Sequence, residues 1–189
     1  MDISLVLREK RPGHLVYAIP AWYRVLMLAI AAVLVASILV TGDGSGAVPW
    51  IIFGIALVAS LYEERWVVDA EARVMRHRFG LLPLARTIVL PFERIEGFRL
   101  RAFVRGSNPG APNAAEESSR IIAALDPTGD ANALRDRRSR LKRAYISLIC
   151  DDTEGGGLVI NTLPARRASE LKTAGSRLAS AAGKSLVAD

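Results

Sequence analysis

The sequence has little of the material from which enzymes and metal sites are built. Cys150 is the single cysteine in 189 residues, which excludes a disulfide framework and a cysteine-rich zinc site. The two histidines, His14 and His77, leave little for triad or metal chemistry. Motifs of serine hydrolases, zinc proteases and nucleotide-binding glycine loops are missing. We therefore predict no catalytic residue, cofactor or metal, and a protein that is not an enzyme.

The remaining candidates for chemistry have simpler interpretations. Cys150 alternates with apolar residues in a predicted strand, so we expect a small buried side chain rather than a nucleophile. His77 shares a predicted strand face with Met75 and Phe79, which favours a histidine in or near the core. The acidic group at 151, 152 and 154 adjoins three glycines and is predicted to be a turn.

Charge is missing altogether from two long apolar runs, residues 25–40 and 47–62. Each run has 16 residues, and flanking residues extend the first to about 20, the length that crosses a bilayer. A short glycine-rich connector, 41–46, separates them. We predict a transmembrane helical hairpin over 22–63, preceded by an N-terminal segment, 1–21. The alternative, a hairpin buried in a soluble core, would need more covering sequence than the chain has.

The basic residues around this hairpin predict its orientation. Four precede the first run and four lie within the 16 residues after the second, whereas the connector has none. This distribution places both termini in the cytoplasm. Aromatic residues at the ends of the runs are typical of membrane-interface anchors, and these are Trp22, Tyr23, Trp50, Tyr62 and Trp66.

Beyond the hairpin the periodicity changes to that of strands. Alternation predicts two strands in 64–80 joined at Asp69–Ala72, a strand at 85–92 and another at 95–105. Strands resume at 143–152 and 158–163. An apolar stripe then recurs every three or four residues from Pro164 to Ala182, which predicts an amphipathic helix ended by Gly183. The small residues of this stripe would let the helix pack closely on a sheet.

An insertion interrupts the strands at 106–143. Its proline, glycine and charged residues predict disorder, although the apolar stretch 121–125 would form a helical turn or dock on the domain. Six of its last nine residues are basic and one is acidic. They would form either a solvated loop or a contact with anionic lipid headgroups, through Arg135, Arg137, Arg138, Arg140, Lys142 and Arg143. A basic run this local argues against nucleic-acid binding.

Four stretches, 67–80, 88–100, 146–164 and 168–187, together resemble a bacterial pleckstrin-homology-like (PH-like) domain. The Phe-Gly pair at 79–80 and the Pro-Phe-x-x-Ile-x-Gly segment at 91–97 carry much of the likeness. The resemblance implies two roughly orthogonal antiparallel sheets, or a barrel, capped by a C-terminal helix. The layout is also similar to the photosystem I assembly factor family, which has a two-helix membrane hairpin, although the insertion at 106–143 departs from it.

These observations predict a membrane α-hairpin followed by a β-rich α+β domain over 64–189. The expected location is the bacterial inner membrane. The expected role is an interaction module, either an assembly factor or an accessory subunit of a membrane protein complex. The alternative is a module that binds anionic lipid through the basic run. The sequence identifies neither the partner nor the oligomeric state.

Overall fold

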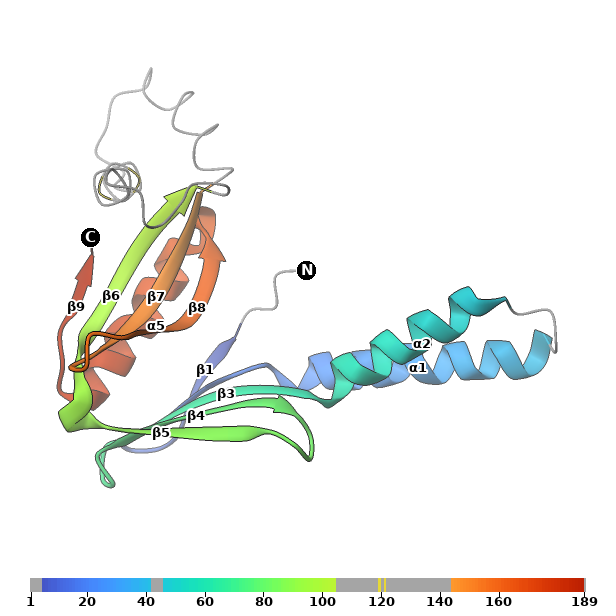
Figure 1. Cartoon of the computed structure of the whole chain (residues 1–189), viewed down its shortest axis with the longest axis horizontal. Coiled ribbons are helices and arrows are strands. Elements are labelled where there is room, and N and C mark those ends of the chain that lie inside the picture. Colours follow the sequence, from blue (N-terminus) through green and yellow to red (C-terminus); the bar gives the residue numbers. More distant parts are fainter. Residues whose placement is uncertain (1–4, 42–45, 105–118, 120, 122–143, 189) are drawn as a thin grey trace, which may run out of the picture.

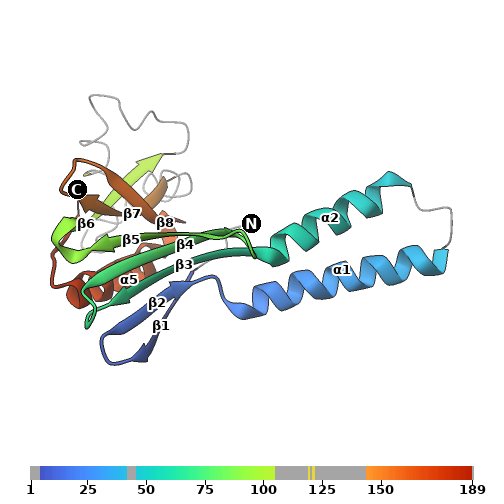
Figure 2. The ribbon, with the colours of Figure 1, turned by 60° about the horizontal axis from the view of Figure 1, so that its bottom comes forward.

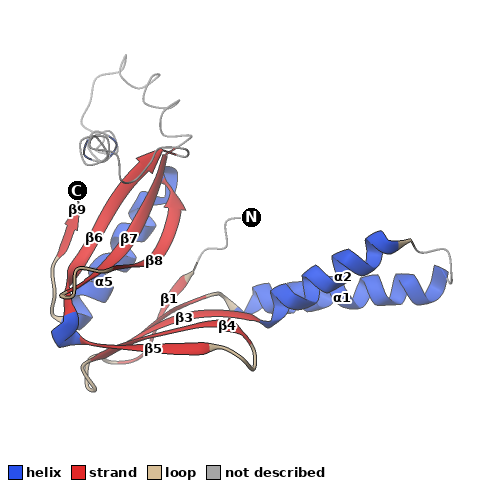
Figure 3. Ribbon diagram, in the orientation of Figure 1, coloured by secondary structure: helices blue, strands red, loops and turns tan. Residues whose placement is uncertain are grey.

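The computed structural model describes residues 5–41, 46–104, 119, 121 and 144–188. It is an α+β fold made of two β-sheets, a pair of long helices and a C-terminal helix (Figure 3). The six basic residues of the predicted lipid contact, at 135–143, lie outside the described residues. Within the predicted insertion only Ser119 and Ile121 are described, and the Ile121 side chain is buried in the core.

The first sheet has five antiparallel strands in sequence order. They are β1 (Val6–Arg11), β2 (His14–Ala18), β3 (Tyr62–Asp69), β4 (Val74–Leu81) and β5 (Arg86–Pro91). The turn predicted at Asp69–Ala72 joins β3 and β4 and is confirmed. The Asp69 carboxylate accepts a hydrogen bond from the Ala72 backbone N–H, at 3.0 Å. The sequence predicted that 1–21 is an N-terminal segment separate from the domain at 64–189. That division was wrong, because β1 and β2 belong to this sheet.

Two helices are inserted between β2 and β3, and they project from the end of the sheet (Figures 1 and 2). They are α1 (Ala21–Thr41) and α2 (Ala47–Leu61). Because Ala18 pairs with Arg65 across β2 and β3, both ends of the helix pair return to one sheet. Of the described helices, α1 is long and apolar enough to cross a membrane, whereas α2 is shorter than this requires.

The second sheet is mixed, with strand order β8-β7-β6-β9. Its strands are β6 (Ile95–Val104), β7 (Ala144–Asp152), β8 (Gly157–Pro164) and β9 (Leu186–Ala188). Sequence analysis missed β9, which pairs in parallel with β6 and is only three residues long. In the described part of the chain the two sheets stay separate, so the barrel form of the predicted architecture does not occur.

The C-terminal helix α5 (Ala168–Ala182) lies against both sheets and covers the core between them (Figure 1). It contributes Leu171 and Leu178, which meet Trp66 and Val68 of the first sheet and Leu148 of the second in one buried cluster. Gly183 ends the helix, as predicted, and its backbone has a left-handed conformation. The helix begins four residues after Pro164, because Pro164 still pairs in β8 and a 3-10 turn, Ala165–Arg167, follows it.

Candidate functional site at the base of the helix pair

A groove of about 680 Å³ opens where α5, β1 and the first turn of α1 meet. We call it the base groove. Residues of these three elements, of β2, of β8 and of the adjoining turns line it, namely Leu5, Val6, Leu7, Tyr17, Pro20, Trp22, Tyr23, Leu163, Arg167, Ser169, Glu170, Thr173, Ala174 and Arg177. Concave sites lined mostly by apolar groups with a few polar ones are where proteins bind ligands. The base groove is therefore the first candidate for a binding site.

The floor of the base groove comes from the inward faces of β1 and β2. Leu7 lies opposite Tyr17 in the pairing of these strands, and Leu5 is buried one step further along the same face. The Tyr17 hydroxyl accepts a hydrogen bond from the Asn161 side-chain amide of β8, at 2.5 Å, which ties the two sheets together. Burial of the ring raises the pKa of Tyr17. The hydroxyl is therefore neutral at physiological pH.

One wall of the base groove is an exposed row on α5. Arg167 donates two hydrogen bonds to Glu170, at 2.9 and 2.6 Å, and this contact lowers the pKa of the Glu170 carboxyl. Thr173 and Arg177 continue the row one turn and two turns further on. With Glu170 occupied by Arg167, the wall offers a hydroxyl and a guanidinium to a bound partner.

The other wall is β1, the outermost strand of its sheet. Of the described strands, only β2 pairs with it, so its outer backbone edge has no strand partner. An unpaired edge offers backbone N–H and C=O groups to an added strand. The base groove thus combines an apolar floor, a polar helix wall and an open strand edge.

A smaller hollow of about 240 Å³ lies on the opposite face of the first sheet, also at the foot of α1. Its basic lining residues are Arg8, Lys10, Arg24 and Arg65, and its acidic ones are Glu63 and Glu64. The buried Glu63 carboxylate pairs with Arg65 at 3.8 Å and with Arg78 at 3.4 Å. Cationic side chains therefore surround the foot of the helix pair on this face.

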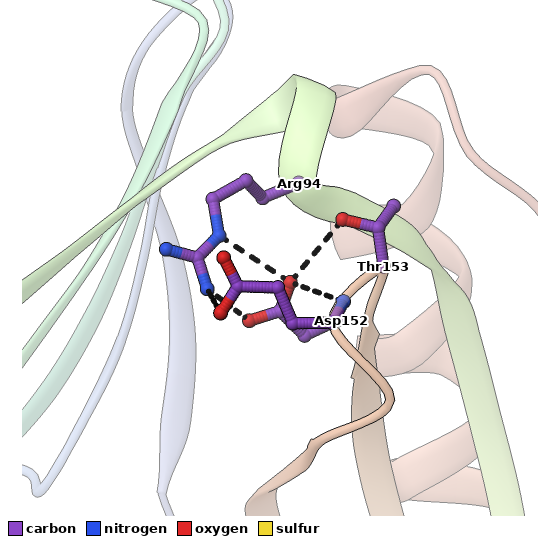
Figure 4. A network of polar contacts seen from close by, with 4 residues as sticks. Arg94, Asp152 and Thr153 are labelled. Atoms are coloured by element: carbon purple, nitrogen blue, oxygen red, sulfur yellow. Dashed lines mark hydrogen bonds and ion pairs between the residues drawn. The ribbon is translucent and has the colours of Figure 1, made fainter.

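The acidic group at 151–154 has a structural role in the turn where sequence analysis placed it. Arg94, in the corner between β5 and β6, binds Asp152 at 2.7 Å and Glu154 at 2.6 Å (Figure 4). The Arg94 backbone carbonyl also accepts a hydrogen bond from the Thr153 N–H. Arg94 holds the pKa of Asp152 below its usual range. Through Asp152 and Glu154, these contacts clamp the β7–β8 turn to the segment between β5 and β6.

The predicted aromatic anchors divide into two groups. Trp22 and Trp50 are 62% and 52% exposed on the helix pair, and Tyr62 is exposed at the end of α2. Trp66 is only 1% exposed, and its ring stacks on His77 at 3.7 Å within the core. Its assignment as a membrane anchor was wrong, because β3 turns this side chain inward. Tyr23 is also buried, beside the base groove, so it does not present its ring to a membrane.

The Cys150 and His77 side chains lie where the sequence predicted them. Cys150 is fully buried, and burial raises the pKa of its thiol to about 12, as expected of a structural side chain. His77 lies between Trp66 and Phe79, and burial lowers its pKa. Among the described residues, no three histidine, cysteine, aspartate or glutamate side chains gather as a metal site would require. The base groove itself was not foreseen, although the alternation of Leu5 and Leu7 was a signal for β1.

The comparisons with known proteins add no family. No protein-family model matches the chain, and no curated protein is significantly similar to it. The function is therefore argued from the arrangement of the base groove and the helix pair.

Proposed function

We propose that this protein is a membrane-anchored interaction module, an assembly factor or accessory subunit of a bacterial inner-membrane protein complex. In this proposal the helix pair crosses the membrane and the two-sheet part is a PH-like domain at the cytoplasmic face. The observation that carries the proposal is the position of the base groove. Because Pro20, Trp22 and Tyr23 line it, a partner bound there would lie at the membrane surface.

The surface of the helix pair supports the membrane anchor. Large apolar side chains are exposed along both helices, among them Val25, Leu28, Val33, Leu39, Val40, Val48, Ile51, Ile55 and Val58. An exposed apolar surface of this extent is stable only when lipid or protein covers it. The 15 residues of α2 span about 22 Å at 1.5 Å per residue, less than the ~30 Å hydrocarbon core. The bilayer would thin locally around α2, at modest cost.

The connectivity supports a common side for both ends of the chain. The strands before and after the helix pair are hydrogen-bonded neighbours, so a hairpin that enters the bilayer returns to the face it left. The basic residues that precede and follow the helices lie on this returning side. By the positive-inside rule that side is the cytoplasm.

Strand addition is the binding mode that the base groove favours. A segment of a partner protein would extend the sheet at β1 and place alternate apolar side chains over Leu5 and Leu7. The same face would also meet Thr173 and Arg177 on α5. The open edge supplies main-chain hydrogen bonds, and the apolar floor supplies selectivity. We expect the partner segment to be juxtamembrane, since the base groove adjoins the foot of α1.

Affinity purification of the tagged full-length protein from native membranes in mild detergent tests this function. The wild-type chain should retain a membrane protein complex in stoichiometric amount. Thr173→Arg, which places a long charged side chain in the base groove, should lose that complex. Ser176→Arg is the matched control, because Ser176 is also exposed on α5 but does not line the groove. Isolation of the wild type without protein partners, or equal loss in both variants, would contradict the proposal.

Binding of anionic lipid is the second candidate function. The basic residues around the smaller hollow favour it, together with the basic run at 135–143. Each basic residue near an anionic surface contributes about 1 kcal/mol, and salt screens this attraction. Purification that returns only lipid, enriched in anionic headgroups, would favour this function over the first.

A further inference from the structure

Among the described residues outside the helix pair, the turn between β4 and β5 exposes several apolar side chains close together. Its sequence is Leu81-Leu82-Pro83-Leu84, whereas the other hairpin turns of this sheet, 12–13 and 70–73, have no large aliphatic side chain. Leu84 is 81% exposed and Leu81 is 39% exposed. An exposed leucine by itself is ordinary, but three exposed apolar residues in one turn, Leu81, Pro83 and Leu84, need a covering surface.

This turn lies beside the point where the helix pair leaves the sheet. The Leu82 backbone N–H donates a hydrogen bond to the carbonyl of Leu61, the last residue of α2, at 2.9 Å. In the strand register, Leu81 lies opposite Tyr62, the first residue of β3. Figure 1 shows the turn at the foot of α2, at the end of the sheet opposite the β3–β4 turn. The turn and the C-terminal end of α2 therefore lie at the same height along the axis of the helix pair.

We propose that the β4–β5 turn inserts into the cytoplasmic interface of the bilayer, as a third contact beside α1 and α2. The proposal rests on the membrane anchor proposed above. If α2 ends at the membrane surface, its hydrogen-bonded neighbour enters the interfacial layer, which is roughly 5–8 Å thick on each side. Leu81, Pro83 and Leu84 then lie among the upper acyl chains. The lipid around α1 and α2 thus covers the turn as well, because the exposed apolar surface of the turn adjoins that of the helices.

The charges next to the turn suit an interfacial position. Arg86 is exposed two residues after Leu84, where its side chain reaches headgroup phosphates. Within the described residues, Arg86 has no ion pair, whereas Arg78 on the neighbouring strand pairs with Glu63. Acidic side chains are missing from 74–92. The turn would therefore hold the sheet at a defined tilt to the membrane and keep the base groove at a defined height above it.

A depth measurement on the full-length protein tests this insertion. Single cysteines replace Leu84 in the turn, Glu71 in the β3–β4 turn and Ile55 in α2, and each carries an environment-sensitive fluorophore. Cys150 is buried, so the wild-type chain supplies the unlabelled blank. The protein is reconstituted in phosphatidylcholine–phosphatidylglycerol vesicles that contain lipids with nitroxide at a shallow or a deep acyl position.

We expect the label at 84 to show blue-shifted emission and to be quenched most by the shallow nitroxide. The label at 55 should respond more to the deep nitroxide, and the label at 71 to neither. If the label at 55 responds as expected while the label at 84 behaves like the label at 71, the insertion is refuted and the membrane anchor stands. If 84 is shifted but lipid nitroxides leave it unquenched, protein covers the turn and the insertion is again refuted. If 55 itself is aqueous, the anchor fails and the insertion fails with it.

Discussion

Gly175 offers a sharp test of how closely α5 packs on the second sheet. It lies in the middle of the helix, between Leu171 and Leu178, and its backbone faces β7 and β9. A Cβ added at this position would lie 2.9 Å from Leu148 Cδ1 and 3.2 Å from Leu186 Cδ1. Carbon atoms pack best at about 3.5–4.0 Å, so a methyl group here forces its neighbours to move.

Two effects of the substitution Gly175→Ala oppose each other. Replacing glycine inside a helix stabilises it by about 1 kcal/mol. Overpacking a well-filled core costs about 1–3 kcal/mol. Leu186 lies in a short edge strand and can move, but Leu148 is fully buried in the central part of its sheet. We therefore expect overpacking to win, with a net loss of about 1 kcal/mol for alanine and about 2–3 kcal/mol for the larger Gly175→Val.

The assay is equilibrium urea unfolding of the full-length protein in detergent micelles. Replacing Trp22 and Trp50 by phenylalanine leaves Trp66, in the domain core, as the only indole reporter. With a urea m-value of about 1–3 kcal/mol/M, a loss of 1 kcal/mol lowers the unfolding midpoint by roughly 0.3–1 M urea. Ser176→Ala controls for helix propensity, and should stabilise by about 0.5 kcal/mol because Ser176 is exposed. If Gly175→Ala proved more stable than wild type by the full ~1 kcal/mol, α5 would lie farther from the sheet than described here.

Two further predictions concern ionisable groups of the domain. Because Arg94 lowers the folded-state pKa of Asp152, the stability from this carboxylate is present above its unfolded-state pKa and is lost as pH falls through the folded value. Asp152→Asn should therefore lower stability at neutral pH and flatten its decline below about pH 4, in urea titrations at several pH values; an unchanged profile would contradict the clamp. Cys150 should resist iodoacetamide at pH 8 in the folded chain and react in urea, as measured by mass, since its thiol is buried and has a pKa of about 12. Rapid alkylation without urea would contradict its burial.

Local sequence patterns predicted the strands and the helix whose periodicity or turn residues lie within a short stretch of the chain. The β3–β4 hairpin followed from alternation and the turn at Asp69, and β6 and β7 followed from alternation alone. The α5 stripe and its end at Gly183 followed from helical spacing. These signals are reliable because the period of the backbone and the chemistry of a turn act within one element.

Pairings between distant segments were not predictable in this way. The charged residues of β1 conceal its strand character, and only pairing with β2 reveals it as the edge of a sheet that resumes at Tyr62. Trp66 follows an apolar run closely enough to suggest a membrane anchor, yet β3 places it in the core. The three residues of β9 carry no signal of their own, and they form a strand only because β6 offers a free edge.

Composition and short-range periodicity were enough to predict the two apolar helices, most of the strands and the final helix, because each of these depends on neighbouring residues. The sheet formed by the N-terminal strands and β3 could be seen only in the folded chain, as could the position of the base groove and the β4–β5 turn at the foot of the helix pair. The physical reason is that both sites combine residues far apart in the chain. Their contacts exist only after β2 and β3 have paired and brought the two ends of the inserted helix pair to one sheet.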